Sequence, residues 1–109
     1  MQQVLSLRFA ETVRRLVAAA RPLGLATPTF RSPPGLAGAD RTIRRRPDGS
    51  VVVAVALRGR PWPVVEADLV EGVLAANGLL GPVAERARVS LLACLADGPA
   101  PVAPVRAAA

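Results

Sequence analysis

The chain has 109 residues, of which 14 are basic and 8 acidic, so its formal net charge at pH 7 is +6. This length suits one small domain with a single hydrophobic core. The longest uncharged stretch, Gly72 to Ala84, is too short to span a bilayer. The chain has no histidine and one cysteine, which excludes histidine-based nucleophilic sites, disulfide frameworks and Cys/His zinc motifs. We therefore expect no cofactor, no metal and no membrane partner.

All 14 basic residues are arginine, a bias typical of a GC-rich genome, which we interpret as bacterial. This bias weakens the net charge as evidence for an anionic partner. The charge is also unevenly distributed. Residues 1–60 hold 11 arginines and 3 acids (net +8), whereas residues 61–109 hold 3 arginines and 5 acids (net −2). Such asymmetry suits either a basic binding face or self-association of a basic part with an acidic part.

The first predicted element is a helix from about Gln3 to Arg21, ended by Pro22. Its apolar residues recur at helical spacing, namely Leu5, Phe9, Val13, Leu16, Val17 and Ala20. Glu11 lies within this segment and no apolar run with a cleavage site follows, so we do not interpret it as a targeting peptide. We expect a cytoplasmic protein. Residues 22–40 are so rich in proline and glycine that they predict a long irregular connection.

The clearest local pattern is a β-hairpin formed by residues 41–46 and 50–57, with Pro47-Asp48-Gly49 between them. A three-residue loop places Ile43 opposite Val53, whereas a two-residue loop would place it opposite Ala54. The first register gathers the apolar side chains on one face, namely Ile43, Val51, Val53, Val55 and Leu57. Because a single buried face determines the register, we predict the three-residue loop.

The opposite face of the hairpin combines small residues with arginines, namely Thr42, Arg44, Arg46, Val52, Ala54, Ala56 and Arg58. Guanidinium groups bind phosphate through two parallel hydrogen bonds, and a strand holds alternate side chains in a row. We therefore predict that four residues contact the nucleic-acid backbone: Arg44, Arg46, Arg58 and Arg60. Trp62 is the only aromatic residue close by, so we expect no sequence preference. The alternative is that the arginines only keep an edge strand soluble.

A second helix is predicted for residues 63–77, with Pro63 near its start and Asn77-Gly78 as its stop. Its core stripe consists of Val65, Leu69, Val73 and Ala76. Val70 and Leu74 lie off this stripe, so we predict that they form the interface of a homodimer.

A third helix is predicted from Pro82 to about Asp97. Its apolar face consists of Val83, Ala87, Leu91, Cys94 and Leu95, which makes the cysteine a small buried hydrophobe. Gly78-Leu79-Leu80-Gly81 lies between the two helices, where KH domains of the second type carry a GxxG loop. Both variable positions are leucine and the Pro-rich C-terminus offers no final strand, so we interpret the glycines as a helix stop and restart and assign no family.

The chain offers few side chains for acid–base catalysis, because only carboxylates and one thiol are available for proton transfer. Asp68 and Glu71 share a helix face, as a pair of hard-metal ligands would. Acids near the positive end of a helix are more simply surface groups that complement its dipole, and this is our interpretation. We predict that the protein is not an enzyme.

Together these elements predict an α+β fold of order α-β-β-α-α over residues 1–98, with an antiparallel β-hairpin packed against helices. Residues 99–109 are predicted to be a flexible Pro/Ala-rich tail. Because two strands make a thin sheet, we expect a partner strand or subunit to complete it. The predicted function is a small binding or regulatory module that contacts nucleic-acid phosphates. The alternative is a homodimeric adaptor that binds a protein partner and has no nucleic-acid role.

Overall fold

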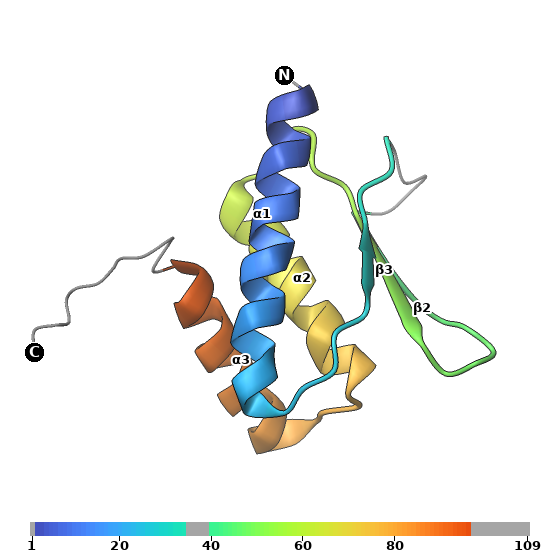
Figure 1. Cartoon of the computed structure of the whole chain (residues 1–109), viewed down its shortest axis with the longest axis vertical. Coiled ribbons are helices and arrows are strands. Elements are labelled where there is room, and N and C mark those ends of the chain that lie inside the picture. Colours follow the sequence, from blue (N-terminus) through green and yellow to red (C-terminus); the bar gives the residue numbers. More distant parts are fainter. Residues whose placement is uncertain (1, 35–39, 97–109) are drawn as a thin grey trace, which may run out of the picture.

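Three helices lie on one side of a three-stranded sheet in the computed structural model, which describes residues 2–34 and 40–96 (Figure 1). The elements in chain order are α1 Gln2–Ala20, the 3₁₀ turn η1 Arg21–Leu23, β1 Thr29–Arg31, β2 Arg41–Arg45, β3 Val51–Val55, α2 Trp62–Ala76 and α3 Gly81–Ala96. The α+β class and the hairpin packed against helices are confirmed, and the observed order is α-β-β-β-α-α. The predicted tail and residues 35–39 of the predicted connection lie outside the described residues.

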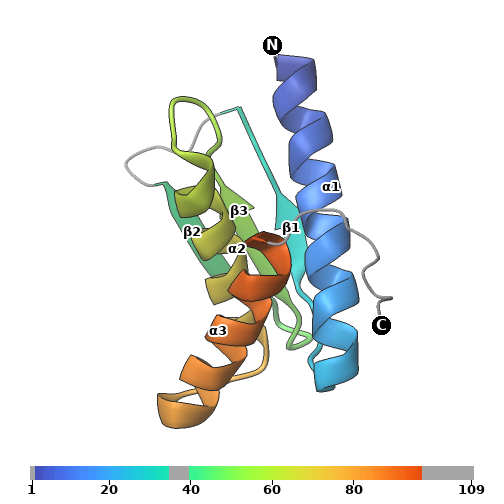
Figure 2. The same cartoon turned by 90° about the vertical axis from the view of Figure 1, so that its left-hand side faces the viewer.

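Strand β1 corrects the prediction that residues 22–40 are irregular. It runs parallel to β3, with Phe30 opposite Val53, and gives the sheet the order β1-β3-β2 (Figure 2). Asn77 positions the segment that leads into β1. Its side chain donates to the Ala26 carbonyl at 2.8 Å and accepts from the Ala26 N–H at 2.9 Å. The third strand that the hairpin lacked therefore comes from the same chain, not from a partner.

The hairpin has the predicted register, with Ile43 opposite Val53 in the antiparallel pair of β2 and β3. Its three-residue loop is closed by the Arg46 N–H, which donates to the Ser50 carbonyl at 2.7 Å. Gly49 takes the left-handed conformation (φ 91°) that this loop requires. Asp48 accepts hydrogen bonds from the backbone N–H and the hydroxyl of Ser50 at 2.9 and 2.7 Å. The loop is therefore held by its own side chains.

Apolar side chains alternate between the two faces of β3, and this alternation shows which face of the sheet the helices cover. Val51, Val53 and Val55 are buried, whereas Val52 and Ala54 between them are half-exposed. Ile43 shares the helix-covered side but is 38% exposed on edge strand β2. Figure 1 shows the helices on one side of β2 and β3 and no described helix on the other side.

Helix α2 lies between the sheet and α3 and is therefore buried on two sides (Figures 1 and 2). Val70 is fully buried and Leu74 is 3% exposed, and both belong to the hydrophobic core. The prediction that they form a dimer interface is wrong, because α3 of the same chain packs against α2 and covers this side. The homodimer alternative thereby loses the surface on which it was based.

Helix α3 turns a slightly different face to the core than its periodicity suggested. Its buried residues are Ala84, Leu91 and Leu95, whereas Val83 is 49% exposed. Cys94 is exposed, so the prediction of a buried thiol is wrong. Leu91 and Leu95 are buried as predicted, so the buried face is turned from the predicted one by only about half a residue step, or roughly 50°.

Gly72 lets α2 approach β3 closely. A Cβ atom at this position would lie 2.7 Å from Val53 Cγ2, well inside van der Waals contact. Gly72→Ala should destabilise the domain by about 1–3 kcal/mol, although alanine is the better helix former. Denaturant unfolding of the purified protein measures this. The matched test is Val53→Ala combined with Gly72→Ala, which should be at least as stable as Val53→Ala alone. An increase in stability for Gly72→Ala in the wild-type background would contradict the close packing.

We predict that the stability contributed by the hairpin loop depends on pH through Asp48. The two hydrogen bonds from Ser50 hold the pKa of the Asp48 carboxyl below its ordinary value. Because the folded pKa is depressed, the loop's contribution to stability is present above the ordinary carboxyl pKa and is lost as the pH falls through the depressed value. Ser50→Ala should raise the Asp48 pKa, which an NMR titration of its carboxyl carbon would show. An Asp48 pKa unchanged by Ser50→Ala would exclude this cause.

Candidate nucleic-acid interface

The side of the sheet away from the helices is a shallow surface that we call the open face. The strand register places six residues on it, two from each strand: Thr29 and Arg31 of β1, Val52 and Ala54 of β3, and Thr42 and Arg44 of β2. Both arginines are exposed, and the two β3 residues between them are half-exposed. The open face therefore has small side chains along its centre and a guanidinium on each flank.

Arg31 is the residue that sequence reasoning missed. It pairs with Ala54 across the parallel register, whereas Arg44 pairs with Val52 on the other side of β3. Their strands lie two spacings apart, so the two backbones are separated by about 10 Å across the sheet. No pattern in the sequence marked β1 as a strand, so nothing indicated that Arg31 faces the same way as Arg44.

Arg46 and Arg58 extend the basic surface beyond the strands. Arg46 lies at the start of the hairpin loop opposite Ser50, and Arg58 lies three residues past the end of β3. Both side chains are exposed. Among residues 2–34 and 40–96, neither forms an ion pair, and the same is true of Arg31 and Arg44. Three of the four predicted arginines are thus exposed and outside any ion pair of the described residues, together with Arg31. After the hydrogen bonds from Ser50, the nearby charge of Arg46 also helps to lower the pKa of the Asp48 carboxyl.

Arg60, the fourth predicted residue, has a structural role instead. Its side chain is 12% exposed, and its Nη2 lies 2.7 Å from Asp68 Oδ2, an ion pair without the alignment of a hydrogen bond. Its Nη1 donates to the carbonyls of Ala56 at 2.9 Å and Asp40 at 3.3 Å. Arg41 donates to the other oxygen of Asp68 at 3.0 Å. Arg60 is therefore not available to an external phosphate.

The acids singled out in the sequence are likewise engaged. Asp68 is 8% exposed and forms ion pairs with the two arginines just described, so it is not a surface acid. Glu71 contacts Arg88 on α3, with 2.6 Å between Oε2 and Nε. Within the part of the chain that the structure describes, no three potential ligands gather as a metal site would need. Asp68 and Glu71 act as separate ion-pair partners.

The arginines of the hairpin and of the loop after it fall into two groups. Those on the helix side are bound to acids or to backbone carbonyls: Arg41 and Arg60 pair with Asp68, and Arg45 donates to the carbonyl of Gly49 at 2.9 Å. Those on the open face have no acidic partner among the described residues. The positive charge of the open face is thus left for solvent or for an anionic ligand.

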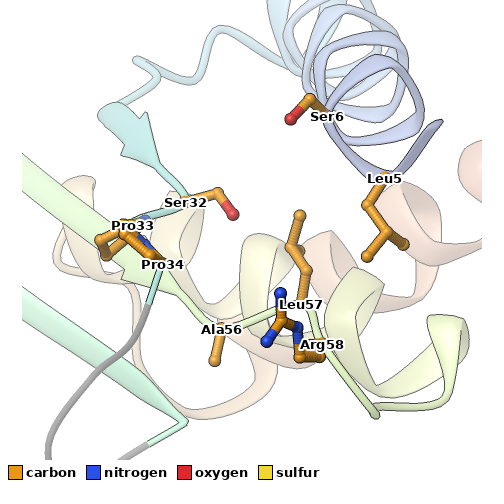
Figure 3. A pocket seen from close by; sticks show the side chains of 8 residues that line it. All are labelled: Leu5, Ser6, Ser32, Pro33, Pro34, Ala56, Leu57 and Arg58. Carbon is orange, nitrogen blue, oxygen red and sulfur yellow. The ribbon is translucent and has the colours of Figure 1, made fainter. Parts of the chain in front are cut away.

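A pocket of about 290 Å³ lies at the carboxyl ends of β1 and β3 (Figure 3). Its walls come from three distant segments, namely Leu5 and Ser6 of α1, Ser32, Pro33 and Pro34 after β1, and Ala56, Leu57 and Arg58 after β3. Sequence analysis missed this pocket because only the tertiary structure brings these segments together. Arg58 belongs both to the predicted arginine set and to the pocket.

The different environments of Arg58 and Arg60 can be separated by matched variants. Arg60→Met should destabilise the domain by about 2–3 kcal/mol, because it removes a buried ion pair and two hydrogen bonds to carbonyls. Arg58→Met should change the free energy of unfolding by less than about 0.5 kcal/mol. Chemical denaturation of both variants checks this. Equal losses of stability would show that the two arginines have the same role.

Comparison of the chain with protein-family models, curated proteins and solved structures found no match. None of the described helices has the length and apolar character needed to cross a membrane. Any statement about function therefore depends on the geometry of the open face and its arginines.

Proposed function

We propose that the domain binds the phosphate backbone of nucleic acids through its open face, as a non-enzymatic binding or regulatory module. The observation that supports this is that four exposed arginines outside any ion pair of the described residues lie on or beside this one face, namely Arg31, Arg44, Arg46 and Arg58. Guanidinium groups match phosphate oxygens in geometry and charge, and they release condensed counterions when they bind. We place this activity in the bacterial cytoplasm, where nucleic acid is accessible.

Protection of an edge strand against pairing with another sheet does not by itself explain where the exposed arginines lie. Charged residues on an edge strand prevent sheet-to-sheet pairing, and this explains Arg44 on β2. It does not explain Arg58, which follows the central strand β3. The small Val52 and Ala54 side chains between the flanking arginines also allow a polymer backbone to approach the sheet. A binding surface accounts for both features.

The aromatic residues favour backbone recognition over base recognition. Trp62 is 9% exposed and lies beneath Arg8, whose guanidinium carbon is 4.4 Å from its ring centroid. Phe30 is packed against the core on the helix side of the sheet. Neither ring is presented on the open face for base stacking, so the proposed binding has little sequence preference.

The proposal predicts salt-dependent binding. Four phosphate contacts should give a slope of about −3 to −4 in a plot of log affinity against log salt. The triple variant Arg44→Ala, Arg46→Ala and Arg58→Ala should flatten that slope by about 2.5–3, because it removes three of the four contacts. Fluorescence anisotropy with a labelled oligonucleotide, measured from about 50 mM salt upward, provides the titration.

The control has the same loss of charge at exposed arginines away from the open face: Arg14→Ala, Arg21→Ala and Arg86→Ala. It should keep most of the slope, because contacts determine the slope more than net charge does. Equal weakening by both triple variants would show that only net charge matters. No binding by the wild type at about 50 mM salt would refute the proposed function.

A further inference from the structure

The pocket at the ends of β1 and β3 adjoins one end of the open face and is closed on its other side by α1. Ser32 directly follows Arg31 of β1, and Ala56 lies two residues after Ala54 of β3. Arg58 lines the pocket and also belongs to the arginines of the proposed interface. A chain bound along the open face that passes this end of the sheet would therefore meet the pocket between the strand ends and α1.

Three polar groups around the pocket have no partner in the described residues. The hydroxyls of Ser6 and Ser32 form no hydrogen bond there, and the guanidinium of Arg58 forms neither a hydrogen bond nor an ion pair. Figure 3 shows all three around the same hollow. Arg60, only two positions further along the chain, is fully engaged, so these groups differ from their surroundings.

The remaining walls are apolar. Leu5, Leu57 and Pro33 face a cavity of about 290 Å³, which is at the lower end of the range for small-molecule sites. A cavity of this size has room for one small planar group and not for two. Its chemistry suits a ligand that combines an anionic group, a hydrogen-bonding edge and apolar faces.

We propose that this pocket takes one unstacked nucleotide of a single strand bound along the open face. Arg58 binds its phosphate, the hydroxyls of Ser6 and Ser32 meet the edge of its base, and the leucine and proline side chains contact the faces of the base. This inference rests on the proposed function and adds a substrate class to it, because a base must leave its stack to enter the pocket. Leaving a duplex carries an unpairing cost that a single strand does not have.

The test compares a fluorescently labelled oligothymidylate of about 15 nucleotides with a duplex of equal length at about 50 mM salt. The wild type should bind the single strand at least about tenfold more tightly. Ser6→Phe places a ring in the pocket from an exposed position on α1 and should remove this preference while leaving duplex affinity unchanged. Ser90→Phe is the matched control at an exposed position on α3 and should keep the preference.

A second variant removes the hydroxyls without filling the pocket. Ser6→Ala combined with Ser32→Ala should reduce single-strand affinity by about fivefold and leave duplex affinity unchanged. Equal wild-type affinity for both probes, or equal effects of Ser6→Phe on both, would overturn the pocket and leave the backbone-binding proposal standing. Absence of binding to either probe would overturn both. Circular dichroism of each variant confirms that it is folded.

Discussion

The close contact of α2 with β3 is the constraint on which the rest of the structure depends. Gly72 has no side chain where it meets Val53, so the helix backbone lies against the central strand. This contact places Asp68, one turn earlier on α2, within reach of Arg41 at the start of β2 and of Arg60 in the loop before α2. The same contact buries Val51, Val53 and Val55. Helix α2 therefore makes most of the helix contacts with one side of the sheet, and no described helix packs on the other side.

The remaining elements anchor this arrangement from the other side of α2. Helix α3 covers Val70 and Leu74, and Arg88 links it to Glu71 of α2. Arg15 of α1 donates to the Leu95 carbonyl at 2.6 Å, which places a positive charge at the negative end of α3. A domain of this size can bury only a modest area, so burial of α2 on two sides contributes much of its core.

Because the helices lie on one side of the sheet, arginines that are bound within the protein are separated from arginines that are exposed to solvent. Arginines that face the helices lie near acids and helix-end carbonyls, because the acids of α2 are on that side. Within the described residues, no acid of a helix forms an ion pair with the arginines of the open face. The proposed interface is thus a consequence of where the helices pack, and the pocket beside it arises where the strand ends meet α1.

The sequence by itself determined the local elements and the hairpin register. Pro47-Asp48-Gly49 permits one favourable loop, and the alternation of valines in β3 selects the face that is buried, so Ile43 opposite Val53 could be predicted. Only the tertiary structure decided which arginines are free and which residues line the pocket. Arg58 and Arg60 look alike in the sequence and differ because Asp68, on another element, reaches only Arg60. Strand β1 carries no local pattern, because its pairing with β3 and its tether to Asn77 are contacts between distant segments.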